Sequence, residues 1–89
     1  MQVTVEISIY PLVEDYTSII IEFINKLKEK SDVNVYSTAM STYVSGDYDN
    51  VMRTLTVELK LLYTKVPDSS TIVKIIPKDL NIEDGFLTF

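Results

Sequence analysis

The sequence contains no cysteine and no histidine, and only two glycines and three prolines among its 89 residues. Without cysteine there is neither a disulfide nor a thiolate metal site. Without histidine the chain lacks the commonest metal ligand and the commonest general base. Two glycines do not build a phosphate-binding loop, and no Ser-His-Asp or Cys-His arrangement can be assembled. We therefore expect a protein that is not an enzyme and that holds no metal or cofactor.

Basic side chains are the minority, with eight lysines and arginines against thirteen acidic residues and a net charge of −5. An acidic chain repels the phosphate backbone, so we expect no nucleic-acid partner. No apolar stretch approaches the roughly 20 residues that span a bilayer, so we expect no membrane association. The N-terminus opens on a strand pattern rather than on a charged segment followed by an apolar run. These features predict a cytoplasmic protein.

The short length bears directly on stability. We expect one domain over residues 1–89, with a core over residues 2–77 and a C-terminal tail over residues 78–89. A domain of this size buries only about two-thirds of its unfolded surface. Self-assembly is the remaining way for this chain to bury more surface. Its apolar fraction of 46% can supply both a core and a subunit interface. The tail ends in Gly-Phe-Leu-Thr-Phe, which we expect to dock on a neighbouring copy.

The first half of the chain switches from one hydrophobic period to another. Apolar residues at alternate positions over residues 3–9 predict a half-buried strand, which Pro11 ends. Apolar residues then recur at helical spacing, predicting a helix over residues 15–30 with Asp15 as its N-cap. The β-branched and hydroxyl-rich residues 33–45 predict a hairpin with strands near 33–38 and 41–45.

The second half repeats the pattern. Gly46-Asp47 stops the hairpin strand and Asp47 caps a helix that runs to Val66. We favour this capping role over the alternative, in which Asp47 or Asp49 forms an acid–base pair with Glu6. A turn precedes the last predicted strand, residues 71–76, which Pro77 closes.

The order strand, helix, strand, strand, helix, strand is the split βαβ pattern of a ferredoxin-like α+β fold. Each helix has one apolar stripe, so both helices must cover the same face of a four-stranded antiparallel sheet. The opposite face then carries Thr4, Glu6, Ser8 and Tyr10 of the first strand. This surface is polar and aromatic, and we expect something to sit on it.

A cluster of hydroxyl groups lies at the predicted hairpin, over residues 37–43. Four serines and threonines, Ser37 among them, surround Met40 in this segment. Hydroxyls both donate and accept hydrogen bonds, so the cluster suits a neutral heterocycle, with Tyr10 or Tyr36 as a stacking surface. The alternative is that serine and threonine simply populate a hairpin and that the tyrosines pack in the core or an interface.

Two segments carry a family resemblance. Residues 7–11, Ile-Ser-Ile-Tyr-Pro, and residues 40–52, which run from Met-Ser-Thr-Tyr to Asp-Asn-Val-Met, resemble the signature segments of the YkoF-like thiamine-binding protein family. The likeness covers roughly residues 2–77. It implies a ferredoxin-like fold, assembly into dimers and then tetramers through sheet faces or edges, and binding of thiamine or its hydroxymethylpyrimidine portion. The positions that it implies for ligand binding are Ser8, Tyr10, Ser41, Thr42, Gly46 and Asp47, with Met40 as a lining residue.

Two functions follow as alternatives. The first is a non-catalytic small-molecule-binding protein, for which the acidic chain favours thiamine or the pyrimidine over thiamine diphosphate. The second is a structural or regulatory homo-oligomeric module without a ligand, in which the hydroxyl-rich strand is only an interface. An enzyme of the acylphosphatase kind shares this topology but needs an arginine-bearing phosphate loop, and residues 10–15 contain acids and no arginine.

Overall fold

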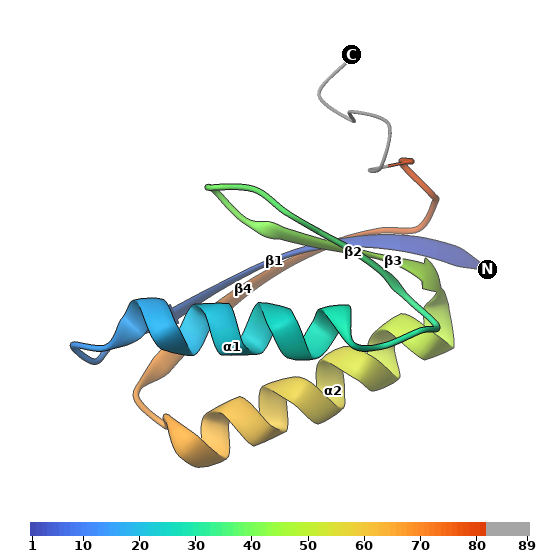
Figure 1. Cartoon of the computed structure of the whole chain (residues 1–89). Helices are drawn as coiled ribbons and strands as arrows, with labels where there is room; N and C mark the ends of the chain where they lie inside the picture. Colours follow the sequence, from blue (N-terminus) through green and yellow to red (C-terminus); the bar gives the residue numbers. More distant parts are fainter. Residues whose placement is uncertain (82–89) are drawn as a thin grey trace.

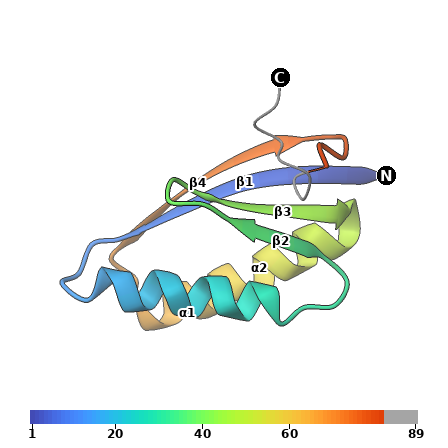
Figure 2. The ribbon, with the colours of Figure 1, turned by 45° about the horizontal axis from the view of Figure 1, so that its top comes forward.

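The computed structural model describes residues 1–81, and its chain runs through two helices and one four-stranded sheet (Figure 1). The elements are β1 (Gln2–Pro11), α1 (Tyr16–Lys28), β2 (Asn34–Ser37), β3 (Thr42–Asp47), α2 (Tyr48–Lys65) and β4 (Ser69–Ile76). The sheet is antiparallel with strand order β2-β3-β1-β4. Both helices lie on one face of it (Figure 2). The predicted ferredoxin-like α+β fold is confirmed. Residues 82–89, where docking of the apolar tail on a neighbour was expected, lie outside the described residues.

Strand β1 is the centre of the sheet, paired with β3 on one side and β4 on the other. Its alternate residues Val3, Val5, Ile7 and Ile9 are buried, as the period of two predicts. Thr4 is buried as well, although it belongs to the opposite face. The reason is that residues 78–80 cross it: the Thr4 hydroxyl donates to the carbonyl of Lys78 (2.9 Å) and accepts from the amide of Leu80 (3.1 Å).

The helices close the core over the inner sheet face. Phe23 and Leu27 of α1 and Val51, Leu55 and Leu62 of α2 are buried against β1 and β3. Burying side chains of this size stabilises the fold by about 1.5–3 kcal/mol each. No helix within residues 1–81 is long and apolar enough to cross a membrane.

The helix ends differ in how they are capped. Asp47 accepts a hydrogen bond from the amide of Asp49 (3.2 Å), which confirms its predicted capping role. Asp15 stands at the N-cap position of α1, but its side chain makes no capping hydrogen bond. Its backbone angles, φ −88° and ψ 44°, differ from the extended conformation that presents a capping carboxylate to the helix.

Strand boundaries depart from the prediction at two places. Strand β3 continues through Gly46 to Asp47 because these residues pair with Val3 and Gln2 of β1. Strand β4 starts at Ser69 rather than at residue 71, because Ser69 and Ser70 pair with the end of β1. In both cases a polar residue that is common in turns extends a strand because a partner strand satisfies its backbone.

Candidate functional site

A pocket of about 470 Å³ lies where β1, α1 and the β2–β3 hairpin meet. Pockets for small ligands usually measure about 300–1,000 Å³. The lining comes from the end of β1 and the residue after it, from one side of α1, and from the hairpin: Ile7, Ser8, Ile9, Tyr10, Pro11, Leu12, Tyr16, Ile20, Ile24, Thr38, Ala39, Met40, Ser41 and Thr42. None of these side chains is charged.

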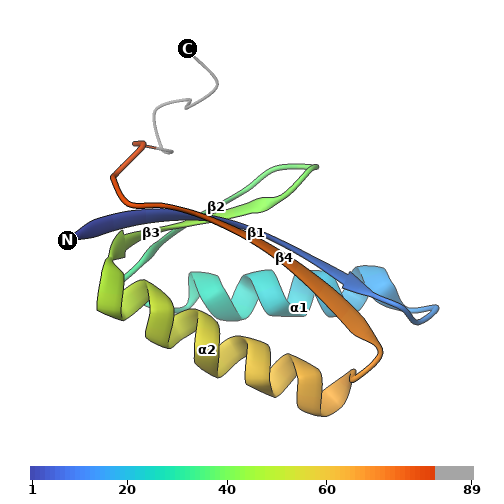
Figure 3. The same ribbon diagram turned by 180° about the vertical axis from the view of Figure 1, so that it is seen from behind.

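The pocket exists because the hairpin leaves the sheet. Pairing between β1 and β3 stops at Ile7 and Thr42, whereas pairing between β1 and β4 continues to Pro11. Beyond residue 42 the tip of the hairpin stands away from β1, on the side of the sheet opposite the helices (Figures 1 and 3). One edge of β1 therefore has no strand partner over residues 8–10 within the described chain.

That free edge supplies main-chain hydrogen-bonding groups. Successive residues of a strand point their N–H and C=O groups to opposite sides. At least one residue of the three at positions 8–10 must therefore present a donor and an acceptor to the pocket. Buried main-chain groups are nearly always paired. A planar ligand with a donor next to an acceptor would complete this edge as a neighbouring strand would.

The hairpin tip is organised by one threonine. The Thr38 hydroxyl accepts from the amides of Met40 (3.1 Å) and Ser41 (3.3 Å) and donates to the carbonyl of Ser41 (3.2 Å). The Thr38 amide donates to the same carbonyl at 2.9 Å. These bonds hold the tip without a glycine turn, so the wall of the pocket is built before any ligand arrives.

The remaining hydroxyls of the cluster also have partners. The hydroxyls of Ser37 and Thr42 lie 3.2 Å apart across the two hairpin strands. Ser41 donates to the carboxylate of Glu6 (3.2 Å), which also accepts from Tyr43 (3.0 Å). Each hydroxyl retains a further donor or acceptor position, so the cluster both stabilises the hairpin and lines the pocket.

Aromatic and thioether groups surround the mouth of the pocket. Tyr10, Tyr16 and Met40 line it, with 49%, 54% and 85% of their surface exposed. Exposed apolar groups gathered around a hollow are typical of binding surfaces. The hydroxyls of Ser8, Tyr10 and Tyr16 make no hydrogen bond to another residue within the described chain, so they are open to a ligand.

Five of the eight predicted site residues line this pocket: Ser8, Tyr10, Met40, Ser41 and Thr42. Ser37 lies behind it and reaches it through its contact with Thr42. The sequence did not point to Tyr16, Ile20 and Ile24, because their spacing along α1 also fits a core stripe. The exposure of Tyr16 is what assigns it to the pocket rather than to the core.

Gly46 and Asp47 lie at the other end of the sheet. They pair with Val3 and Gln2, which lie four and five residues, or about 13 and 17 Å, along β1 from Ile7. Gly46 has a φ of +147°, and Asp47 caps α2 and lies 3.6 Å from the N-terminal amino group. Both have structural roles here, and neither lines the pocket.

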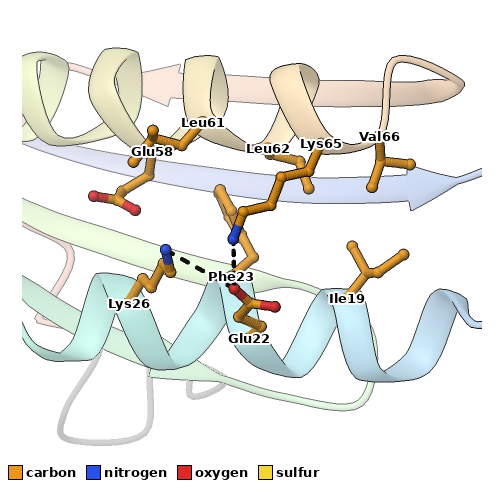
Figure 4. A pocket seen from close by; sticks show the side chains of 9 residues that line it. All are labelled: Ile19, Glu22, Phe23, Lys26, Glu58, Leu61, Leu62, Lys65 and Val66. Atoms are coloured by element: carbon orange, nitrogen blue, oxygen red, sulfur yellow. Dashed lines mark hydrogen bonds and ion pairs between the residues drawn. The ribbon is translucent and has the colours of Figure 1, made fainter.

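A second hollow, between the two helices, is too small for a ligand. It encloses about 40 Å³, enough for a water molecule or two. Charged residues surround its apolar floor (Figure 4): Glu22 lies 2.9 Å from Lys65 and 3.9 Å from Lys26. These contacts join α1 to α2 on the solvent side.

Replacing Lys65 with methionine should lower stability slightly at neutral pH and low salt. The hydrogen bond and charge of Lys65 hold the pKa of Glu22 below its usual 4.5, and those of Glu22 raise the pKa of Lys65. A carboxyl group whose pKa is lower in the folded state stabilises the fold at pH values above its unfolded pKa. That stabilisation is lost as the pH falls through the folded pKa. Urea unfolding should show the difference at pH 7 but not at about pH 3 or in about 1 M salt. A deficit that persists in high salt would contradict the electrostatic origin.

The structure thus defines a class: a ferredoxin-like α+β domain with an uncharged pocket at one end of its sheet. The model of the YkoF-related family matches residues 2–71, and the chain belongs to this family. The family predicted from the sequence is therefore confirmed. No curated protein has a sequence that matches this one.

Solved structures share the fold. A protein from Streptococcus pneumoniae is 23% identical with a TM-score of 0.81, over 99% of this chain and 100% of that one. A Thermotoga maritima protein proposed to act in thiamine biosynthesis or salvage is 22% identical, with a TM-score of 0.77 over 88% of this chain and 85% of that one. A hypothetical protein from Methanocaldococcus jannascii is 25% identical, with a TM-score of 0.75 over 93% of this chain and 90% of that one.

Proposed function

We propose that this chain is a cytoplasmic, non-catalytic protein that binds thiamine or its hydroxymethylpyrimidine portion in the pocket at the end of β1. The observation that carries the proposal is the pocket itself: about 470 Å³, uncharged, and bordered by an unpaired strand edge. Membership of the YkoF-related family and the Thermotoga maritima structure support the choice of ligand. The absence of histidine and cysteine from the sequence supports binding without catalysis.

An aminopyrimidine matches the polar groups of the pocket. Its ring nitrogens accept and its amino group donates in one plane, the arrangement that the free edge of β1 complements. Its flat faces need an apolar surface, which the ring of Tyr10 or Tyr16 and the thioether of Met40 supply. The hydroxyls of Ser8 and Ser41 lie within the same lining and suit the hydroxymethyl group.

Charge sets the expected order of affinities. A diphosphate would need a cation beside it, and none of the lining residues is basic. The thiazolium of thiamine is cationic, and the carboxylate of Glu6 accepts a hydrogen bond from the lining residue Ser41 at 3.2 Å. The net charge of −5 also repels a diphosphate at long range. Both the uncharged pyrimidine and cationic thiamine should therefore bind more tightly than thiamine diphosphate.

Titration calorimetry with hydroxymethylpyrimidine, thiamine and thiamine diphosphate should give measurable binding for the first two and at least about tenfold weaker binding for the third. Ala39→Trp places a large ring in the pocket from an exposed position of the hairpin and should abolish binding of all three. Its control, Thr64→Trp, places the same ring on an exposed face of α2 and should leave affinity unchanged.

Two results would contradict the proposal. The first is tightest binding to the diphosphate, which would require a basic site elsewhere. The second is full affinity in the folded Ala39→Trp variant, which would place the ligand outside this pocket. Circular dichroism of each variant separates loss of binding from loss of fold.

A further inference from the structure

The hydroxyl of Ser41, in the lining of the pocket, has its proton committed to a carboxylate. Oγ of Ser41 donates to Oε2 of Glu6 at 3.2 Å. An ionised carboxylate only accepts hydrogen bonds, so the proton between these two oxygens belongs to Ser41. Turning that proton toward a ligand would leave the two oxygens facing each other lone pair to lone pair. Toward the pocket, Ser41 therefore presents lone pairs and no proton.

The carboxylate of Glu6 is itself held by the strands on both sides of it. Tyr43 of β3 and Lys74 of β4 lie directly opposite Glu6 in the sheet. The Tyr43 hydroxyl donates to Oε2 at 3.0 Å, and Nζ of Lys74 lies 3.7 Å from Oε1. These contacts restrain the carboxylate from two sides. A hydrogen bond to an ionised group is also about twice as strong as one between neutral groups, so Ser41 stays a donor to Glu6.

The main-chain groups of Ser41 are occupied as well. Its amide donates to the Thr38 hydroxyl at 3.3 Å, and its carbonyl accepts from the amide and the hydroxyl of Thr38 at 2.9 and 3.2 Å. Only the lone pairs of Oγ are left for a ligand. The hydroxyls of Ser8 and Tyr10, which have no hydrogen-bond partner within residues 1–81, can turn to donate or to accept. Ser41 therefore has a fixed polarity, whereas these neighbours adapt to the ligand.

We propose that Ser41, positioned by Glu6, selects ring ligands that carry an amino group over those that carry an oxo group in the same place. This inference rests on the proposed function, whose two ligands share an amino-substituted pyrimidine. An amino N–H donates to Oγ of Ser41, whereas an oxo oxygen would meet it with lone pairs on both sides. A site built to pair with a polar group strongly rejects an analogue that leaves the site unpaired. Glu6 acts through Ser41 and is a positioning residue.

Titration calorimetry with hydroxymethylpyrimidine and its oxo analogue, both uncharged, tests this selection. The wild type should bind the amino ring at least about tenfold more tightly. Exchanging amino for oxo also places a proton on the adjacent ring nitrogen, so variants are needed to isolate Ser41. Glu6→Met removes the carboxylate and frees the Ser41 proton to donate to the oxo group. The affinity for the oxo ring should then rise at least about threefold, a gain that structural damage does not produce.

Two further variants complete the test, and circular dichroism checks that each is folded. Ser41→Ala removes the acceptor, so it should weaken binding of the amino ring and not of the oxo ring. Lys74→Met removes the ion pair to the other oxygen of Glu6 and should keep the wild-type ratio of the two affinities. Equal binding of both rings by the wild type, a ratio unchanged in Glu6→Met or Ser41→Ala, or a ratio lost in Lys74→Met would overturn this inference and leave the proposed function standing. Binding of neither ring would overturn both.

Discussion

Replacing Gly46 with alanine should lower the free energy of unfolding by about 2 kcal/mol. The φ of Gly46 is +147°, a backbone conformation that costs a residue with a side chain roughly 1–3 kcal/mol. A Cβ atom at this position would also lie 3.4 Å from the carbonyl oxygen of Asp32 and 3.6 Å from Cγ2 of Val51. Both are ordinary van der Waals distances, so the expected cost comes from the backbone conformation. Urea unfolding monitored by circular dichroism measures the change.

The same variant tests what Gly46 does for the ligand. Because it lies far from the pocket, the folded fraction of Gly46→Ala should bind hydroxymethylpyrimidine with unchanged affinity. Ser45→Ala is the matched control, since it adds no strain at the neighbouring position of β3 and should cost less than about 1 kcal/mol. Full stability with a loss of affinity would instead place Gly46 at a ligand site, as the family resemblance implied.

Replacing Lys30 with methionine should destabilise the protein by about 2 kcal/mol, because it leaves the carboxylate of Glu58 without its cation. Glu58 lies on the buried stripe of α2 with 4% of its side chain exposed, and Nζ of Lys30 lies 3.2 Å from its Oε2. Breaking a fully buried pair costs about 3–5 kcal/mol. The loss here should be smaller, since Lys30 itself is 39% exposed and water reaches it.

A double-mutant cycle isolates the pair. Lys30→Met combined with Glu58→Met should recover most of the stability lost in the single variant, because an apolar pair has no charge to desolvate. Lys28→Met replaces an exposed lysine of the same helix end that forms no ion pair within residues 1–81, and it should stay within about 0.5 kcal/mol of wild type. A Lys30→Met variant as stable as wild type would show that Glu58 does not depend on this cation.

Much of the fold was predictable because its signals are local. The alternation of residues 3–9 and the helical stripe around Phe23 and Leu27 each reveal a buried face within a single element. Two helices with one apolar stripe each and four strands can then pack together in only a few arrangements. Boundaries were less predictable: Ser69 and Gly46 belong to strands only because β1 lies beside them and pairs with their backbone.

The candidate site was predictable in part, for the same reason. Ser8, Tyr10 and the hairpin residues Met40, Ser41 and Thr42, predicted from residue type or from the family resemblance, line one pocket. The predicted Ser37 lies behind it. Gly46 and Asp47 were grouped with them because they are close in the sequence. In the folded chain, β3 carries them to the opposite end of the sheet. The pattern does not separate Tyr16 from the core stripe of α1, because a helical period does not reveal how far the neighbouring elements extend over a residue.

The sequence by itself determined which residue types this protein has to work with, and these include no histidine and no cysteine. It also determined the inward face of each helix and strand, since hydrophobic period is a property of neighbouring residues. Only the tertiary structure decided where β3 stops pairing with β1, and so where an uncharged pocket opens. Within residues 1–81 it also left Ile72, Val73 and Ile75 of β4 largely exposed. Both features depend on how elements distant in sequence pack, and no local pattern encodes that packing.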